Sequence, residues 1–320
     1  MSGLRSLVGQ YLDVQLNTGA GVRTRIVERP SRSLEAKECA RLVADLRTVA
    51  RSVLSDGELT YGVLTGDPER LSRLVVTVLY DRDSGQPIAF NALAILPCRL
   101  RGRDEDVLHL GLVMVNPEHR GRRLSWVLYG LTCVLLFLRR QLRPLWISNV
   151  TQVPAIVGMV AESFARVFPT AAGRERRSHD HLVLGREILR HHRSAFGVGE
   201  EAGFDTERFV ITNAYTGGSD DLKKTFEEAQ KHRDPVYNEM CRRELDYERG
   251  DDFLQLGQFN LQMLRRYLLK TVPRDSLPAL LGHLAFAGLG TIVLPLIHWL
   301  SPRRPMGELR PRPGRREGSR

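Results

Sequence analysis

The chain has 320 residues, of which 42% are hydrophobic and 26% are charged, and its formal net charge is +10. This apolar content suffices for one large core or two smaller ones, which excludes a wholly disordered chain. The cysteines lie far apart, with no C-x-x-C pair, at Cys39, Cys98, Cys133 and Cys241. Such spacing argues against a disulfide framework or a zinc site and indicates a reducing compartment.

Hydrophobic periodicity predicts strands and helices that alternate along the first half of the chain. The first of these elements are a strand over 23–29, a helix capped by Ser33 and reaching about Leu54, and strands over 74–80, 87–96 and 107–115. A polar, Gly-containing turn over 81–86 joins the second and third strands. After them we expect a helix over 124–140, a strand over 145–150 and a helix over 154–164. This order is typical of a mixed α/β fold.

Residues 111–125 run from an apolar strand through a Pro-containing turn and a basic loop to the start of a helix. Backbone N–H groups that are free at a helix N-terminus, together with the helix dipole, favour an anion there. Arg120, Arg122 and Arg123 add positive charge at the same place. The segment therefore predicts a phosphate-binding loop.

The same segment resembles motif A of the GNAT superfamily of acyl-CoA N-acyltransferases. In that motif an Arg or Gln, two spacers, Gly, one spacer and Gly or Ala wrap the pyrophosphate of coenzyme A. Arg120, Gly121 and Arg122 fit the pattern, whereas Arg123 and Ser125 occupy the two small-residue slots. Ser125 has two interpretations, a phosphate ligand or a plain helix N-cap. The order of elements is also that of GNAT domains, so the resemblance covers residues 22–190.

A second local match follows the strand over 145–150. Members of this family often have Asn, two residues and Ala there, with a Gly-Phe pair further on; Gln152, Ala155 and Ser163-Phe164 occupy these slots. The resemblance implies that Gln152 contacts the pantetheine arm of the donor. Met159 stands where the family often has a tyrosine that protonates the leaving thiolate. Either another group serves as the acid, or the thiolate leaves unassisted because a thiol has a pKa of only about 8.5.

His109 is the candidate general base. Family members with a glutamate base carry it eleven residues before the Arg or Gln of motif A, and His109 stands at that distance from Arg120. An imidazole is suited to accept a proton from an amine near neutral pH, although a histidine in an apolar strand can also be a simple packing residue. The resemblance places the donor on these residues: Val113, Met114, Val115, Arg120, Gly121, Arg122, Arg123, Leu124, Ser125 and Gln152.

We expect no metal site and no permanently bound cofactor. His179, Asp180 and His181 resemble a metal pair, but alternation in a predicted strand places the two histidines on one face without a third ligand. The donor is a co-substrate. Arg123 obstructs close approach of phosphate to the backbone, so the donor is an acyl carrier protein thioester, or else acyl-coenzyme A whose phosphates pair with Arg123. The third alternative is a site that has lost its ligand.

The remainder of the chain predicts a helical extension over 191–276, including helices over 220–231, 235–247 and, as an amphipathic helix, 253–269. Residues 277–300 contain no Asp, Glu, Lys or Arg and are long enough to cross a bilayer or lie in one leaflet; a buried helix of a soluble core is the third interpretation. The tail over 301–320 is basic and predicted to be disordered, with seven Arg and two Glu. Anionic lipid suits it better than nucleic acid, because no interleaved aromatics or recognition motif accompany it.

These observations predict an N-terminal segment over 1–21, a GNAT-like α/β domain over 22–190 with a mixed central sheet flanked by helices, the helical region, the membrane segment and the tail. The expected function is transfer of an acyl group, favoured by the membrane segment to be a fatty acyl group, from a thioester to an amine-bearing, lipid-like acceptor. The alternative is a catalytically silent, membrane-tethered scaffold. The N-terminus has no apolar stretch typical of a secretory signal, so we expect a membrane-associated protein with a cytoplasmic catalytic domain.

Overall fold

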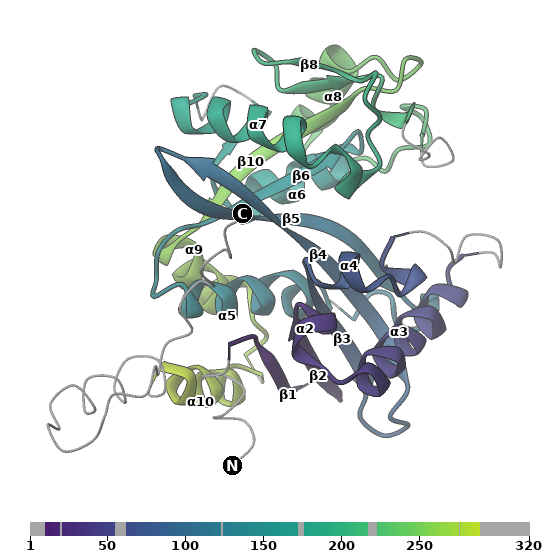
Figure 1. Cartoon of the computed structure of the whole chain (residues 1–320), viewed down its shortest axis with the longest axis vertical. Coiled ribbons are helices and arrows are strands. Elements are labelled where there is room, and N and C mark those ends of the chain that lie inside the picture. Colours follow the sequence, from purple (N-terminus) through teal and green to yellow (C-terminus); the bar gives the residue numbers. More distant parts are fainter. Residues whose placement is uncertain are drawn as a thin grey trace, which may run out of the picture. The chain divides into compact units, whose positions relative to one another are not determined.

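The computed structural model describes residues 10–19, 21–54, 62–122, 124–171, 176–216, 223–274 and 276–288. The chain forms two compact units (Figure 1). Unit 1 comprises Met1–Leu93, Leu112–Arg143 and Arg265–Arg320, and unit 2 comprises Ala94–Gly111 and Pro144–Leu264. Two long strands, β4 (Pro87–Leu100) and β5 (Arg103–Val115), contribute residues to both units.

Unit 1 has a sheet in the order β1-β2-β3-β4-β5, with β2 antiparallel to both β1 and β3. Its remaining strands are β1 (Asp13–Gly19), β2 (Val22–Glu28) and β3 (Leu74–Asp81). Its helical elements are α2 (Pro30–Ser33), α3 (Ala36–Arg51), η2 (Gly62–Thr65), α4 (Pro68–Leu71), η3 (Pro117–His119), η4 (Trp126–Leu131), α5 (Thr132–Arg139), η9 (Tyr267–Thr271) and α10 (Leu277–Gly288).

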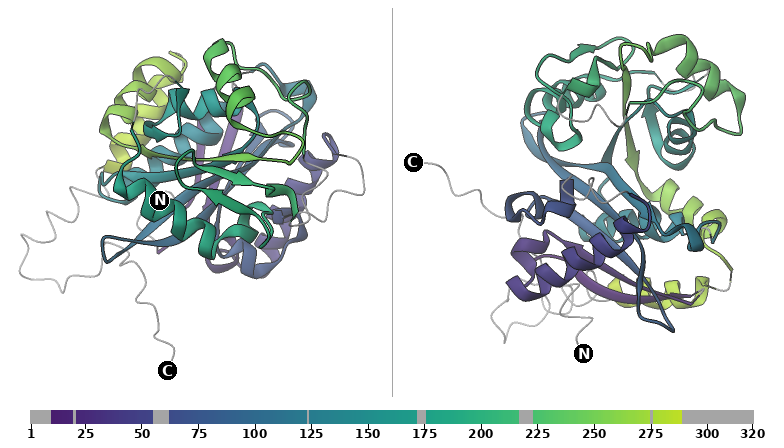
Figure 2. Two further views of the ribbon diagram at one scale, coloured as in Figure 1. Left: turned by 90° about the horizontal axis from the view of Figure 1, so that it is seen from above. Right: turned by 90° about the vertical axis from the view of Figure 1, so that its right-hand side faces the viewer.

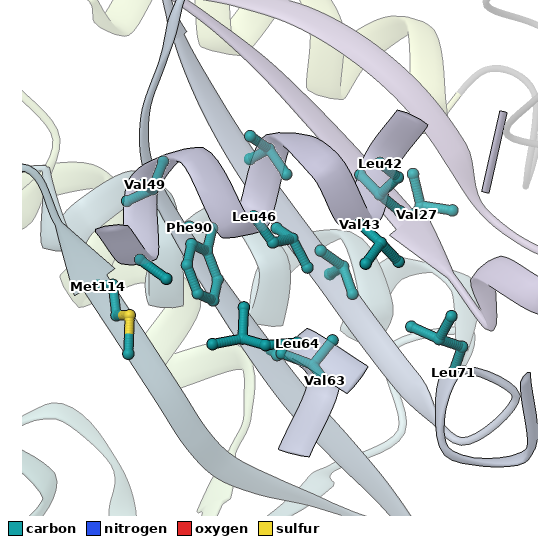
Figure 3. Close-up of a cluster of buried hydrophobic side chains, with 14 of the residues drawn as sticks. Val27, Leu42, Val43, Leu46, Val49, Val63, Leu64, Leu71, Phe90 and Met114 are labelled. Atoms are coloured by element: carbon teal, nitrogen blue, oxygen red, sulfur yellow. The ribbon is translucent and has the colours of Figure 1, made fainter. Parts of the chain in front are cut away.

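The main core of unit 1 lies between α3 and the sheet (Figure 3). Leu42 and Leu46 of α3 pack in one cluster with Phe90 of β4 and Met114 of β5. Burying side chains of this size contributes roughly 1.5–3 kcal/mol each, so the cluster is a main source of stability for the unit. The predicted helix is confirmed, but Ser33 does not cap it: α3 begins at Ala36, and Ser33 closes the separate short helix α2.

The other face of the same sheet carries η4 and α5 (Figure 2). Thr77 of β3 points away from the α3 side, because its neighbours Val76 and Val78 belong to the α3 cluster. The Thr77 hydroxyl lies 2.7 Å from the hydroxyl of Thr132 at the start of α5. Helices therefore cover both faces of the sheet of unit 1, which confirms the predicted α/β fold class.

Unit 2 has a sheet in the order β4-β5-β6-β10-β9-β8, with β7 paired to β10. Its strands, besides parts of β4 and β5, are β6 (Leu145–Thr151), β7 (Ala165–Phe168), β8 (Gly203–Asp205), β9 (Val210–Thr212) and β10 (Asp252–Phe259). Its helical elements are α6 (Pro154–Ser163), α7 (His179–His191), η6 (Arg193–Phe196), η7 (Ala214–Thr216) and α8 (Pro235–Glu244), and α9 (Leu261–Arg266) begins in it. The sheet is mixed, since β6 is parallel to β5 and antiparallel to β10.

The two faces of this sheet differ in what covers them. Helix α6 lies on one face, where the Gln255 amide donates to the carbonyl of Val157 at 3.2 Å. Helix α7 lies on the other face, where the ring of His181 meets Trp146 edge-on at 5.4 Å. Side chains alternate along a strand, so Ser148 and Val150 share the α7 face with Trp146. The β6–β10 register adds Leu256, which lies opposite Ser148, to that face.

The prediction of a helix over 253–269 is wrong. Residues up to Phe259 form β10, which pairs with β6 along seven residues from Phe253↔Thr151 to Phe259↔Leu145. Only α9 and the π-helical turn η9 are helical. The polar residues Gln255 and Gln258, three positions apart, imitated the polar face of a helix, whereas both are buried in the sheet.

Two further local predictions are corrected. Residues 179–181 begin helix α7 instead of forming a strand, and Ser178 and His181 form a capping box there. His179 is exposed and His181 is buried, so the two histidines do not share one face as a metal pair. Of the predicted helix over 220–231, residues 223–231 form one turn within irregular backbone and no helix, and residues 220–222 lie outside the described residues. The predicted helix over 235–247 is confirmed as far as Glu244, where α8 ends.

The expected membrane segment over 277–300 is described only as far as α10, which ends at Gly288 and contacts β1 in unit 1. In the described part of the chain, no helix is both long and apolar enough to cross a bilayer. Residues 289–300 and the basic tail lie outside the described residues.

Candidate functional site

His109 lies in the part of β5 that belongs to unit 2, where Val107, Leu108 and His109 pair with Trp146, Ile147 and Ser148. Its side chain is 4% exposed, and its Nδ1 atom lies 3.0 Å from the Oγ atom of Ser148, which is itself fully buried. The ring of Phe196 covers the imidazole at a centroid distance of 5.1 Å. His109 is therefore both packed and hydrogen-bonded through one nitrogen.

Phe196 is held over His109 by the segment that follows α7. The Nε2 atom of His192 lies 2.8 Å from the Pro97 carbonyl of β4. The Arg193 guanidinium donates to the carbonyls of Leu189, Gly199, Glu200 and Ala202. One arginine thus closes the turn after Phe196 onto the end of α7.

Burial lowers the pKa of His109 to about 4, because the charged imidazolium would lose its water. At neutral pH the ring is therefore uncharged, which is the form a general base requires. The Ser148 contact has two hydrogen arrangements. If Nδ1–H donates to Ser148, Nε2 keeps a lone pair and can accept a proton; if Ser148 donates to Nδ1, Nε2 carries hydrogen and cannot.

The end of β5 and the basic loop belong to unit 1. Met114 is buried in the core cluster with Phe90 (Figure 3), whereas Val113 and Val115 are half-buried on the opposite face of the strand. The Asn116 carboxamide accepts a hydrogen bond from the Glu118 N–H at 3.0 Å and begins the short helix η3. The side chain of Met114 is thus a core residue, while the strand backbone at 113–115 remains the part that a pantetheine arm could contact.

The loop after η3 has an exposed, basic surface. Arg120, Gly121 and Arg122 are all exposed, and Gly121 has a φ of 82°, a left-handed conformation that favours glycine. A side chain at Gly121 would meet no atom within 4 Å, so the glycine serves the backbone conformation and not close packing. Arg123 lies outside the described residues.

The helix that follows this loop starts without a side-chain cap. Leu124 is buried, and its carbonyl accepts from the N–H groups of Val127 and Leu128 at 3.1 Å each. Ser125 is exposed, and within the described residues its hydroxyl makes no capping hydrogen bond. Of the two interpretations of Ser125, the capping one is therefore not seen in this structure.

The first turns of the helix are π-helical, over η4, and side chains from other elements satisfy the displaced carbonyls. The Tyr267 hydroxyl donates to the Trp126 carbonyl at 3.0 Å, and the Asn91 amide of β4 donates to the Leu128 carbonyl. Thr132 also donates to the Leu128 carbonyl, at 2.9 Å. Such π-turns are often found at functional sites, and here the turn directly follows the basic loop.

Gln152 follows β6 in unit 2 and is 1% exposed. In the amide orientation that satisfies its hydrogen-bonding atoms, its oxygen accepts from the Lys224 N–H and the Tyr215 hydroxyl, at 2.8 Å each, and its nitrogen donates to the Lys224 carbonyl at 3.2 Å. Its backbone carbonyl accepts from the Tyr247 hydroxyl at 2.7 Å. The amide of Gln152, which is predicted to contact the pantetheine arm, is thus already hydrogen-bonded to the backbone of Lys224 and to Tyr215.

A buried carboxyl group completes this network. Asp252 is 5% exposed, and its Oδ1 accepts a hydrogen bond from the Tyr215 hydroxyl at 3.1 Å. The single hydroxyl hydrogen of Tyr215 can serve Asp252 or Gln152 but not both at once. When Asp252 is protonated, the acid can donate to the Tyr215 oxygen while Tyr215 donates to Gln152. Burial raises the pKa of Asp252 to about 7, in agreement with a protonated acid near neutrality.

Sequence reasoning singled out His109 and Gln152 but missed their partners, which are Ser148, Phe196, Tyr215 and Asp252. Ser148 lies four residues before Gln152 on β6, but only the register of parallel strands places it opposite His109. Asp252 is the first residue of β10 and stands one position before the predicted helix over 253–269, so no sequence pattern places it in a buried strand. Met159 lies half-buried on α6, and its thioether carries no hydrogen to donate.

The chain matches no family model and no curated protein. Among solved structures, it is similar to the ribosomal-protein-S5-alanine acetyltransferase from Vibrio fischeri, at 13% identity and a TM-score of 0.29 over 43% of this chain and 75% of that one. It is also similar to NAA60 from Arabidopsis thaliana in complex with a bisubstrate analogue, at 16% identity and a TM-score of 0.28 over 48% and 92% of the two chains. At these TM-scores the likeness assigns neither a family nor an activity to this chain.

Proposed function

We propose that the protein is an N-acyltransferase of the GNAT type, which transfers an acyl group from a thioester to an amine. The observation that carries this proposal is on β5: a buried, uncharged imidazole, His109, precedes by eleven residues an exposed basic loop with a left-handed glycine, Gly121. One strand thus holds a candidate base and leads directly into a candidate phosphate site. Motif A, given above, supports the same combination.

In the proposed reaction the neutral amine nitrogen attacks the thioester carbonyl carbon and forms the C–N bond. The C–S bond then breaks, and the thiolate leaves with its electron pair. His109, directly or through water, takes the proton that the nitrogen loses. Backbone amides of residues 111–115 hold the thioester and the pantetheine, and the loop from Arg120 to Ser125 holds phosphate. The thiolate takes its proton from water or from a group other than Met159.

The donor is a coenzyme A or an acyl-carrier-protein thioester, and we propose a fatty acyl chain with a lipid-like acceptor. The sequence supports this choice, because residues 277–300 contain no charged side chain and precede a basic tail. Membrane association and a cytoplasmic catalytic domain belong to the same proposal. The exposed arginines Arg120 and Arg122 suit either a phosphate group or an acidic carrier protein.

The experiment is a binding and turnover series on the full chain in detergent. Thioesters from acetyl to palmitoyl, on coenzyme A and on acyl carrier protein, are offered with a long-chain primary amine, and thioester loss is followed by mass spectrometry. H109Q should lower turnover by about 10²- to 10⁴-fold with donor binding retained. The control H179Q, at an exposed position, should leave turnover unchanged. A wild-type protein that binds no thioester contradicts the proposal.

A catalytically silent scaffold is the second candidate, and one observation favours it. The amide of Gln152, which the resemblance assigns to the pantetheine, is buried and bonded to Lys224 and Tyr215. A donor would have to take over at least one of these bonds. Thioester binding without consumption by any amine would support the scaffold over the enzyme.

A further inference from the structure

The helical segment over 261–271, formed by α9 and η9, has one face packed and one face exposed. Met263 and Tyr267, four residues apart, are 6% and 5% exposed, and the Tyr267 hydroxyl bonds the Trp126 carbonyl. Side chains four residues apart share a face of a helix, so Leu261, Arg265 and Leu269 form a different row. Arg266 and Lys270 form the adjacent row, and all five are exposed.

Large hydrophobic side chains are more exposed in and just after this segment than elsewhere among the described residues. Among the described residues, the three most exposed large hydrophobic side chains are Leu269 at 70%, Leu261 at 58% and Leu281 of α10 at 46%. All three fall within 261–281, and no other large hydrophobic side chain that the structure describes exceeds 37%. Large apolar side chains that gather on an exposed surface mark an interaction site.

The charge on the same segment has one sign. Arg265, Arg266, Lys270 and Arg274 are exposed, and none of them has an ion-pair partner among the residues that the structure describes. From Phe253 to Ser276 the sequence contains a single acid, Asp275. Some exposed cations elsewhere are paired, as Arg242 is with Glu239 and Arg233 with Glu162. The partner of the segment must therefore supply both negative charge and an apolar layer.

We propose that this face, the basic helix face of Leu261, Arg265, Arg266, Leu269 and Lys270, docks on an anionic lipid surface. The leucines enter the boundary between headgroups and acyl chains, and the cations contact lipid phosphates. An acidic protein would have to present an apolar layer beside its carboxylates, whereas an anionic lipid surface supplies both along its whole extent. The inference rests on the membrane association proposed above, and it names the folded surface that makes the contact.

The first test uses the full chain and vesicles of phosphatidylcholine with or without a minor share of phosphatidylglycerol. The patch variant R265E/R266E/K270E is compared with the tail variant R310E/R312E/R315E, which makes the same change in charge. The patch variant should lose at least about 100-fold in partition to anionic vesicles. The tail variant should lose less. Equal loss in both, or loss only in the tail variant, overturns the proposal.

The second test locates the contact and does not depend on charge reversal. The test uses a protein whose native Trp126, Trp146 and Trp299 are replaced by phenylalanine. In it, the fluorescence of L269W should be quenched by brominated lipid in anionic vesicles, whereas that of V53W, also an exposed position in unit 1, should not be quenched. If L269W is not quenched although the protein is bound to vesicles, the proposal is wrong, and another segment of the chain makes the membrane contact. If the wild-type protein binds no vesicles, both the docking face and the proposed membrane association are wrong. Thioester consumption tests the proposed enzyme activity separately.

Discussion

At the scale of single residues, the candidate chemistry depends on one buried pair. His109 and Ser148 come from neighbouring parallel strands, and their side chains meet on the face that α7 and Phe196 cover. Removing water from an imidazole favours its neutral form, so the same burial that makes His109 a packing residue also keeps it ready to accept a proton.

The pH dependence of turnover should reflect this burial. If His109 is the base, kcat/KM should fall on the acid side only below about pH 4–5, because its pKa in the free protein is about 4 and not 6.5. An acid limb near pH 6.5 would mean that an exposed group titrates. The measurement is kcat/KM for a thioester and a weakly basic amine, whose own titration lies outside the range.

Replacement of Ser148 tests whether its contact with Nδ1 supports His109 as the base. S148A removes the partner that holds Nδ1, and the loss of one hydrogen bond of about 0.5–1.5 kcal/mol should reduce kcat roughly threefold to tenfold with little change in KM. The ¹⁵N shifts of His109 should change at the same time, which a purely structural effect on distant packing would not produce. S148T, which restores a hydroxyl, should recover part of the rate.

At the scale of elements, the π-turn η4 connects the basic loop to the body of unit 1. Its carbonyls are bonded by Tyr267 and Asn91, and Gly130 within it leaves room for the Tyr267 ring. A Cβ atom at Gly130 would overlap that ring, so the ring or the helix would have to move.

G130A should therefore destabilise the protein by about 1–3 kcal/mol, the usual cost of overpacking, although alanine favours a helix more than glycine does. Chemical denaturation measures the change. The double variant G130A/Y267L should be less destabilised than the sum of the two single variants, because the clash needs both side chains. Additive effects of the two substitutions would show that a clash with the Tyr267 ring is not what destabilises G130A.

The sequence was most informative where patterns are local. Helix α3, the hairpin β3–β4 and the end of β5 follow from periodicity and turn residues, since each buries one recognisable face. Strand β10 was missed because it is buried on both faces and carries buried glutamines, which removes the alternation. The Ser148 and Asp252 contacts depend on strand register between distant segments, and a single sequence carries no signal for it.

At the scale of the whole molecule, Asp252 should affect how stability changes with pH. Its pKa is about 7 in the folded protein and 3.8 when exposed, so between these values the folded state holds a proton that the unfolded state has released. The free energy of unfolding from this group is therefore largest at acid pH and falls as pH rises through that window. His109 acts in the opposite direction between about pH 4 and 6.5.

D252N should remove the contribution of Asp252 and keep a group that can donate to Tyr215. Relative to wild type, the variant should gain stability as pH rises from 5 to 8, as measured by urea denaturation at each pH. A constant difference between the two proteins over that range would show that Asp252 does not change its protonation on unfolding.

Strand β10 determines when unit 2 can assemble. It pairs with β6 along seven residues and also with β7 and β9, yet it follows β6 by about a hundred positions in the chain. During synthesis, β6 leaves the ribosome long before the strand that completes one of its edges, and pairing across so long a loop is slow. The apolar edge of β6 is therefore exposed to aggregation in the nascent chain, so yield in cells will depend on translation rate and chaperones as much as on equilibrium stability.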